Sequence, residues 1–285
     1  MNVAVGLGRL GHDVTLMTRI GDDAYGEAIR AHIAAAGVQL APSSMVAGGR
    51  TSTATAAIGP DGSAEYDFDL DSSMPVPRHV IDGLLDDVQI VHVGSLASWL
   101  RPGADKVLFL AAAASRRGQL VSYDPNVRPA LISSPEAYVA SVRAWAAAAD
   151  VFKASADDIA YITGYDVGDP ASWTNSSLGC ALMVVTDGAE GASAHVGDRR
   201  IECPSPLVDV VDTIGAGDSF MSALLDGLSR ERLLSAADIE RASEDVIAAV
   251  VTRAGVAASI TCSREGADPP SLSELEAALQ LGPGR

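Results

Sequence analysis

The chain has 285 residues, 48% of them hydrophobic, and its 20 Lys and Arg residues against 37 Asp and Glu give a formal net charge of -17. A chain of this length buries one large core, alone or with a small accessory unit, and its charge argues against nucleic acid and anionic membrane as partners. The three scattered cysteines predict neither a zinc site nor a disulfide framework. No apolar run reaches membrane-spanning length and no secretory leader is evident, so we expect a cytoplasmic protein.

Short Val/Ile/Leu-rich runs alternate with longer Ala-rich runs along the chain. This alternation predicts an α/β fold, a mostly parallel sheet with helices on both faces. The predicted strands are 14–17, 89–93, 120–123, 151–153 and 182–186, and the predicted helices are 25–36, 106–117, 135–149, 219–229 and 236–253. Polar or small residues follow the strands at 92–95, 123–126, 153–155 and 186–188. Because parallel strands end at one edge of a sheet, we expect these tips to line one ligand cleft.

The alternation breaks between about 38 and 72. The runs 51–58 and 64–70, separated by Gly59-Pro60-Asp61-Gly62, predict a β-hairpin. Tyr66, Phe68 and Leu70 alternate and would place apolar groups on one face of it. The pattern fits either a flap over the cleft or a strand pair at the sheet edge. We find no linker or internal repeat, so we expect residues 1–285 to form a single domain.

The segment 208–225 predicts an apolar strand, a small-residue turn and a helix. Gly215 and Gly217 allow the backbone to approach a ligand, and the unpartnered N–H groups that open the helix attract an anion. A carboxylate at Asp218 would repel a phosphate, unless it accepts a proton from a hydroxyl that attacks that phosphate. This predicts a phosphoryl-transfer site with Asp218 as general base; the alternative is Asp218 as an ordinary helix N-cap.

Two motifs resemble signatures of the ribokinase-like (PfkB) carbohydrate kinases. Asp212-Thr213-Ile214-Gly215-Ala216-Gly217-Asp218-Ser219-Phe220 is similar to the C-terminal signature of that family. Asn2-Val3-Ala4, Arg9-Leu10-Gly11, Arg19-Ile20-Gly21-Asp22-Asp23 and Gly26 resemble the N-terminal one. The resemblance extends to about Ser259. It implies a three-layer α/β/α fold with a mostly parallel central sheet and a small β lid at about 38–72.

The resemblance assigns roles to individual residues. Asp218 would be the general base, and the N–H groups of Gly215, Ala216 and Gly217 would form an anion hole for the transferred phosphoryl group. ATP would be bound through Lys153, Ser155, Thr186, Gly188 and Gly191, although 186–191 taken alone fits a strand-to-strand turn equally well. Asp158, where the family usually carries a glutamate, would contact Mg²⁺ through water.

A monovalent cation, K⁺, is also implied beside the anion hole. The matching positions bind it through backbone carbonyls and one aspartate, and are Asp212, Ile214, Val250, Arg253, Gly255 and Ser259. Dimerisation through the lid is common among proteins that resemble this chain, so a homodimer is a further expectation.

For the sugar, the resemblance implies contacts from Asn2, Arg128 and Asp218. The segment 124–128 is similar to one shared by fructokinases and 2-keto-3-deoxygluconate kinases. The acidic lid strand at Tyr66 to Leu70 disfavours a carboxylate substrate, so we expect a fructokinase-like enzyme that phosphorylates a hydroxymethyl group. The alternatives are 2-keto-3-deoxygluconate, ribose and nucleoside kinases.

The resemblance departs from the family at the start of the chain. Family members carry a strand with a sugar-binding aspartate, and then a Gly-Gly pair, shortly before the asparagine that Asn2 matches; here neither precedes Asn2. We therefore expect the first strand of the fold to be missing and sugar to be bound weakly. The departure also keeps open a second class, a non-catalytic ligand-binding relative.

Overall fold

The computed structural model describes residues 1–58, 64–165 and 178–281. Its centre is a six-stranded sheet in the order β12-β11-β10-β9-β8-β7. The parallel strands are β7 (Ile90–Gly94), β8 (Leu120–Asp124), β9 (Val151–Ser155) and β10 (Leu182–Thr186). The sheet continues antiparallel with β11 (Ala192–Val196) and β12 (Arg199–Cys203).

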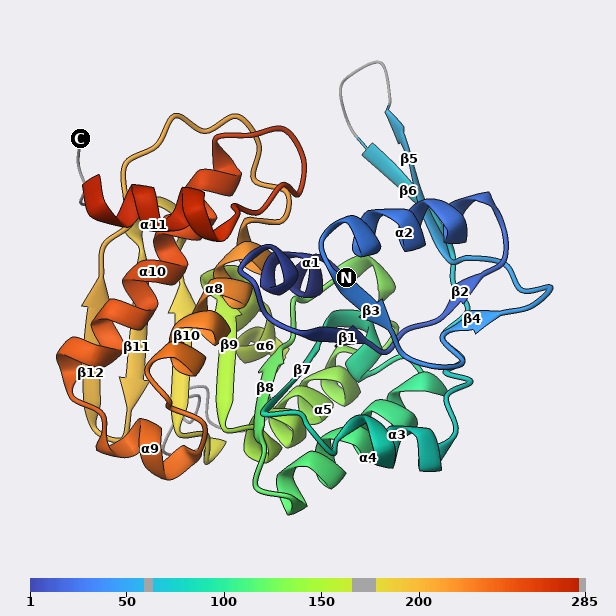
Figure 1. Cartoon of the computed structure of the whole chain (residues 1–285), viewed down its shortest axis with the longest axis horizontal. Coiled ribbons are helices and arrows are strands. Elements are labelled where there is room, and N and C mark those ends of the chain that lie inside the picture. Colours follow the sequence, from blue (N-terminus) through green and yellow to red (C-terminus); the bar gives the residue numbers. More distant parts are fainter. Residues whose placement is uncertain (59–63, 166–177, 282–285) are drawn as a thin grey trace.

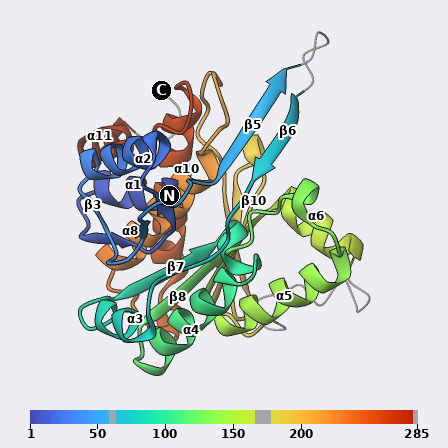
Figure 2. The same cartoon turned by 90° about the vertical axis from the view of Figure 1, so that its right-hand side faces the viewer.

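Helices cover both faces of this sheet (Figures 1 and 2). One face carries α3 (Arg78–Leu84), α4 (Gly103–Arg116), α5 (Pro135–Ala148) and α6 (Ala156–Tyr165). The other carries α1 (Asn2–Arg9), α8 (Ala216–Arg230), α9 (Ala236–Arg241), α10 (Glu244–Cys262) and α11 (Leu272–Leu281). Short 3-10 turns are η1 (Ser95–Ser98), η2 (Pro129–Leu131) and η4 (Gly188–Glu190). The three-layer α/β/α architecture predicted from the alternation is confirmed.

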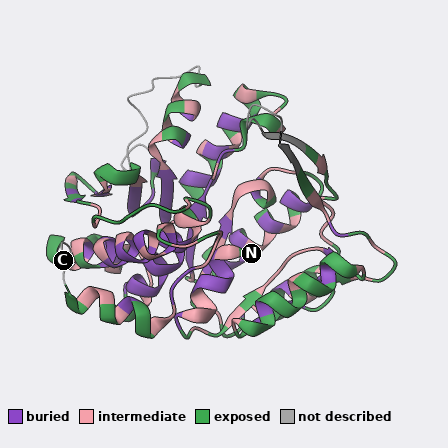
Figure 3. Ribbon diagram, turned by 90° about the horizontal axis from the view of Figure 1, so that it is seen from above, coloured by how far each residue is buried: buried purple, intermediate pink, exposed green. Residues whose placement is uncertain are grey.

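Alternate residues of each strand enter two different cores. Leu120 and Val151 pack with α8 and α10 on one face, while Val121 and Phe152 pack with α4 and α5 on the other. Both faces of a parallel sheet are buried in this way, which is why its strands are nearly continuous apolar runs. Buried residues accordingly concentrate in the strands and on the inner sides of the helices, and the lid strands lie at the periphery (Figure 3).

The predicted hairpin is present as β5 (Thr53–Ile58) and β6 (Ala64–Asp69), paired antiparallel and projecting away from the body (Figures 1 and 2). Phe68 is half-buried, and Leu70 is 36% exposed. The predicted turn at 59–62 and the side chain of Tyr66 lie outside the described part of the chain.

Two short parallel pairs join the lid to the body. They are β1 (Val14–Leu16) with β3 (Val38–Leu40), and β2 (Ile20–Gly21) with β4 (Met45–Val46), and α2 (Ala24–Ala35) lies between them in sequence. Within the described residues neither pair joins the six-stranded sheet, which has β7 at one edge.

Asp23 ties the start of α2 to the base of the lid. Its carboxylate accepts hydrogen bonds from Gly26 N (2.8 Å), Thr51 N (2.7 Å) and Thr51 Oγ1 (2.7 Å). Bonds from the Thr51 backbone and hydroxyl are the main causes that lower the pKa of Asp23 to about 2. Arg19 forms an ion pair with Asp71 (2.6 Å) and donates to Arg50 O (2.6 Å), so it holds both ends of the hairpin. The N-terminal motif therefore fixes the position of the lid.

Three predicted elements differ from the structure. The predicted helix 236–253 is two helices, because Ser243 caps α10 and accepts a hydrogen bond from Val246 N (3.4 Å). The predicted helix 219–229 begins earlier, at Ala216. The predicted strand that opens the segment at 208 is absent: Val208, Val210 and Val211 have no strand partner and are 37%, 62% and 59% exposed.

The sequence predicts no run of membrane-spanning length, yet α10 has 19 residues and is long and apolar enough, by length and composition alone, to cross a membrane. Half of this apolar segment is buried inside the protein, where α10 packs against α8, α11 and β12. Its Arg253 is also buried and paired with Asp226 of α8 (2.6 Å). This is the packing of a core helix.

Gly26→Ala tests the lid base. A Cβ at position 26 would lie 2.0 Å from the backbone oxygen of Gly21, so the β2 to α2 junction must shift. We expect the substitution to lower the free energy of unfolding by about 1–3 kcal/mol, as measured by urea denaturation. The control is Gly83→Ala in α3, where a Cβ meets nothing within 4 Å. If both variants unfold at the wild-type midpoint, the proposed close packing is wrong.

Candidate active site

The turn before α8 forms the predicted anion hole. Gly215, with φ +78°, is the N-cap residue, and α8 begins at Ala216. Ala267 lies behind this turn, because a Cβ on Gly215 would come 2.5 Å from the Ala267 Cβ. The N–H of Ala216 already donates to Thr213 O (3.2 Å). The predicted anion hole thus coincides with a helix N-terminus, where the N–H groups of Gly215 and Gly217 would be the donors for an anion.

Asp218 lies in the first turn of α8 and meets α1. Asn2 Nδ2 donates to Asp218 Oδ2 (2.9 Å), although the two residues are 216 positions apart. The helices approach closely at Gly6, where a Cβ would lie 2.3 Å from Ser222 Oγ. Asp218 is half-buried. The structure thus brings together two of the three predicted sugar-contacting residues, Asn2 and Asp218, and leaves one carboxylate oxygen of Asp218 available to a substrate.

Lys153 lies in the middle of β9, and Asp124 is the last residue of the neighbouring strand β8. Lys153 Nζ donates to Asp124 Oδ2 (2.9 Å), and the two side chains are 5% and 4% exposed. Burial raises the pKa of Asp124, and the Lys153 ammonium opposes that rise. Lys153, a predicted nucleotide contact, has its ammonium beside the start of α8, 3.3 Å from a Cβ position on Gly217.

Ser155 and Asp158 form a reciprocal cap at the start of α6. Ser155 Oγ accepts from Asp158 N (3.0 Å), and Asp158 Oδ2 accepts from Ser155 N (3.0 Å). Asp158 Oδ1 accepts from Val127 N (2.8 Å). Both carboxylate oxygens thus hold the local backbone, although each keeps a lone pair that a metal-bound water can donate to. Within the described residues no group of three or more His, Cys, Asp or Glu is arranged to hold a metal ion.

The predicted nucleotide loop follows β10. Thr186 ends the strand in register with Ser155 of β9, so both residues lie at the same sheet edge. The turn then uses two left-handed glycines, Gly188 (φ +48°) and Gly191 (φ +101°). A Cβ on Gly191 would lie 2.3 Å from Cys203 O. The loop is thereby held at the carboxyl edge of the sheet, where a parallel sheet binds its ligands.

Arg128 is exposed and folds back on its own loop. Its Nη1 donates to Asn126 Oδ1 (2.5 Å), Asn126 O (3.1 Å) and Val127 O (3.0 Å). In this conformation the guanidinium stabilises the turn at Asn126, whose φ is +40°.

The predicted cation ligands are not brought together, which corrects that set. Val250, Arg253, Gly255 and Ser259 lie inside α10, where Gly255 O accepts from Ser259 Oγ (3.0 Å) and Ser259 O accepts from Ser263 N (3.2 Å). Carbonyls committed to a helix in this way do not converge on Asp212.

Asp212 instead contacts the loop that follows α10. Its Oδ2 accepts from Gly266 N (2.8 Å), its Oδ1 accepts from Ile214 N (3.0 Å), and its own N–H donates to Cys262 O (3.2 Å). Near the C-terminus the pattern Arg-x-Gly is present at 253–255 and again at 264–266. The second copy follows the helix end, and Gly266 has φ +70°, a conformation that favours glycine.

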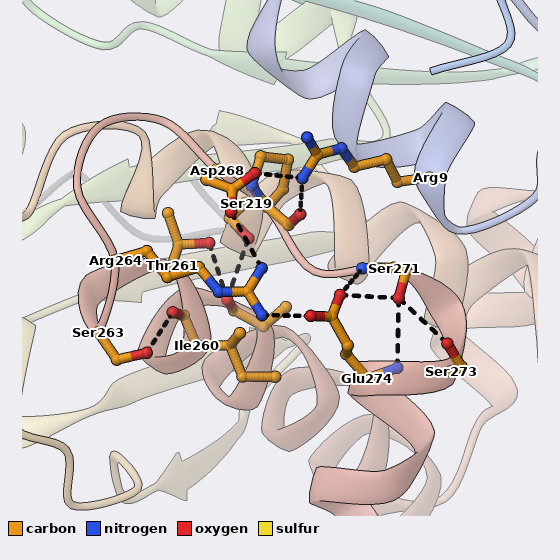
Figure 4. A network of polar contacts seen from close by, with 12 residues as sticks. Arg9, Ser219, Ile260, Thr261, Ser263, Arg264, Asp268, Ser271, Ser273 and Glu274 are labelled. Atoms are coloured by element: carbon orange, nitrogen blue, oxygen red, sulfur yellow. Dashed lines mark hydrogen bonds and ion pairs between the residues drawn. The ribbon is translucent and has the colours of Figure 1, made fainter. Parts of the chain in front are cut away.

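An ion-pair network holds this loop in place (Figure 4). Arg9, at the end of α1, donates to Asp268 Oδ1 (2.5 Å) and to Pro269 O (2.5 Å). Arg264 bonds Asp268 Oδ2 (3.2 Å) and Glu274 Oε1 (2.5 Å). Sequence reasoning noted Arg9 as part of a motif but missed Asp268, which no residue pattern linked to it. The network connects α1 to the residues behind Gly215.

Comparison with known proteins identifies the family. A model described as pfkB family carbohydrate kinase matches residues 1–274. The chain belongs to this family. The resemblance predicted from the two signatures is therefore confirmed, and the chain is a carbohydrate kinase by family.

Several pfkB relatives are named fructokinases. The chain is 32% identical to the fructokinase of Rhizobium leguminosarum bv. trifolii over 252 residues, which cover 86% of this chain and 75% of that protein. It is 30% identical to fructokinase-1 of Oryza sativa subsp. japonica over 279 residues, 96% of this chain and 84% of the relative. The fructokinase of Xylella fastidiosa with bound ATP has a TM-score of 0.87 at 26% identity, covering 98% of this chain and 89% of that one.

The pH dependence of folding stability tests the environment of His92, which lies near the buried Lys153. This residue lies on β7 beside Ser122, and burial, with a smaller contribution from nearby positive charges including Lys153, lowers the pKa of His92 to about 3. A lowered folded-state pKa stabilises the fold fully above the unfolded value of about 6.5, and this stabilisation is lost as the pH falls from there towards 3. We expect wild type to lose roughly 1 kcal/mol per pH unit more than His92→Gln over that window, by urea denaturation. Parallel curves for the two proteins would contradict this.

Proposed function

We propose that the chain is an ATP-dependent fructokinase-like enzyme that phosphorylates a hydroxymethyl group of a small sugar, with Asp218 as general base. The observation that carries this is the contact of Asp218 with Asn2 at the N-terminus of α8, next to Gly215 and Gly217. It places a proton acceptor beside an anion-binding helix end. The relatives named fructokinases support fructose as the sugar.

The geometry suggests how these residues divide the work. Asn2 orients Asp218 by holding Oδ2, which leaves Oδ1 to accept the proton of the attacking hydroxyl. The N–H groups of Gly215 and Gly217, with the dipole of α8 behind them, stabilise the charge on the transferred phosphoryl group. The new bond joins the sugar oxygen to the phosphorus atom. Asp218 then acts on the sugar hydroxyl, and the N–H groups act on the phosphoryl group.

ATP is proposed to lie across the carboxyl edge of the sheet, between Thr186, Gly188, Gly191 and the loop before α8. That loop presents exposed apolar side chains suited to a purine base: Leu207 (95%), Val210 (62%), Val211 (59%) and Ile214 (62%). Ser155 and Asp158 lie at the same edge, and Asp158 would accept from Mg²⁺-bound water. Bound Mg²⁺ supplies charge neutralisation of the phosphates.

A K⁺ ion is proposed at Asp212 and Ile214, against the turn at Gly266 rather than along α10. A double-mutant fructokinase from Vibrio cholerae O395, 25% identical with a TM-score of 0.77, is described in a fructose-, ADP- and potassium-bound form. A cation bound at Asp212 would stiffen the turn that leads into Gly215.

We further propose that the chain folds as a single domain, acts in the cytoplasm and forms a homodimer through the lid. The lid supports dimerisation because its strands project from the body, with Ala54 and Thr55 exposed.

Light scattering coupled to size exclusion tests the proposed homodimer. We expect the mass of two chains, and a monomer mass would contradict the proposal.

Turnover tests the function directly. ADP release is measured with fructose, ribose, 2-keto-3-deoxygluconate and adenosine, and we expect the highest kcat/KM with fructose. Asp218→Asn keeps the contact with Asn2 and removes the base, so kcat should fall roughly a hundredfold or more. Asp82→Asn, at an exposed position of α3, is the control and should keep wild-type turnover. Activity that survives in Asp218→Asn would refute the assigned base.

Cation replacement tests the Asp212 proposal. Exchange of potassium for tetramethylammonium, which is too large for such a site, should lower kcat several-fold. Asp212→Asn should respond less to potassium than wild type, since it weakens the site that the ion needs. Equal turnover of wild type in both buffers would count against a K⁺ role.

A further inference from the structure

The buried pair of Lys153 and Asp124 is the part of the site that the proposed mechanism leaves unused. The chain has two lysines, Lys106 and Lys153, and its other 18 cationic side chains are arginines. Lys153 is 4% exposed and Asp124 is 3% exposed, with 2.9 Å between Nζ and Oδ2. A buried ion pair adds little net stability, because desolvation of both charges offsets their attraction. Stability alone therefore does not explain why this ion pair is buried here.

The position of the ammonium links the pair to the anion hole. A Cβ built on Gly217 meets one atom within 4 Å, and that atom is Lys153 Nζ at 3.3 Å. The ammonium thus packs directly against the backbone that presents the Gly217 N–H. A larger residue at 217 would displace the lysine head, whereas glycine allows the two to touch.

The charge balance also favours a role in anion binding. Three carboxylates lie within electrostatic reach of this point, since Asp158 and Asp218 both act on Asp124. A phosphoryl group brought to the end of α8 would face this negative charge in a chain whose formal charge is -17. The Lys153 ammonium offsets it from behind the helix end, where low solvent exposure leaves its field poorly screened.

We propose that Lys153 is a positioning residue for phosphoryl transfer: anchored by Asp124, it places its ammonium beside Gly217 and adds positive charge to the anion hole. This inference rests on the proposed function of the Gly215 to Gly217 turn. It replaces the prediction that Lys153 contacts ATP directly.

The test separates charge from packing. Lys153→Met removes the charge at similar length, and adding Asp124→Asn removes the carboxylate left unpaired while keeping an acceptor for Asn126 N, which now bonds Asp124 Oδ1 (3.0 Å). Lys106→Met, the same change at the other lysine on α4, is the matched control. For each folded variant, kcat, KM for fructose and for MgATP, and thermal unfolding are measured.

We expect the double variant to unfold within a few degrees of wild type, with kcat reduced roughly 10- to 100-fold and both KM values changed little. Lys106→Met should match wild type throughout. Lys153→Arg, which keeps the charge, should retain more kcat than Lys153→Met. A folded double variant with wild-type kcat would overturn the inference, because packing alone would then explain the pair.

A second readout needs no sugar and therefore separates this inference from the proposed substrate. Thermal unfolding is followed with MgADP and with MgADP plus beryllium fluoride, which mimics the transferred phosphoryl group. The fluoride should raise the melting temperature of wild type and of Lys106→Met, and raise it much less for the double variant. Absence of sugar turnover in wild type would contradict the proposed function alone, whereas equal fluoride shifts, or none in wild type, would contradict the role of Lys153.

Discussion

The close contact between α1 and α8 is the interaction on which the site depends. Gly6 allows the two helices to approach closely. A Cβ at position 6 would lie 2.3 Å from Ser222 Oγ, so a larger residue would push the helices apart. At one end of α1, Asn2 then reaches Asp218, and at the other Arg9 reaches Asp268. Since Ala267 packs behind Gly215, a single short helix fixes both the proposed base and the turn that is proposed to bind the anion. Residues of the N-terminal motif thus contact the C-terminal motif and hold it in position.

A strongly acidic chain that binds phosphates must place its positive potential locally. Here the potential comes from a helix N-terminus and from a lysine buried beneath it, and not from a basic surface. Backbone N–H groups are fixed by the helix and need little reorganisation when charge moves in the reaction. Acidic side chains nearby are mostly occupied, as with Asp158 at the cap of α6 and Asp212 at the turn before α8.

The sequence predicts those helices and strands that depend on local residue patterns. β10 was placed at 182–186 to the residue, because a Val-rich run ends at Asp187-Gly188. In contrast, α1 was not predicted as a helix, since Gly6 and Gly8 lower its propensity and packing on α8 stabilises it. The apolar residues Val208, Val210 and Val211 suggested a strand by propensity alone, but no neighbouring strand pairs with them in the described structure. The sequence could not distinguish the Arg-x-Gly segment at 253–255, which lies inside α10, from the one at 264–266, which follows the helix. Nor could it show that Lys153 is buried.

The central claim is that Asp218 and the Gly215 to Gly217 turn act together on one transferring phosphoryl group. A crystal structure of the chain with fructose, MgADP and beryllium fluoride measures this directly. We expect the fluoride within about 2.7–3.1 Å of the Gly215 or Gly217 nitrogen, and a sugar hydroxyl within about 2.6–3.2 Å of Asp218. Fluoride or sugar bound away from this helix end, with no sugar hydroxyl near Asp218, would contradict the account.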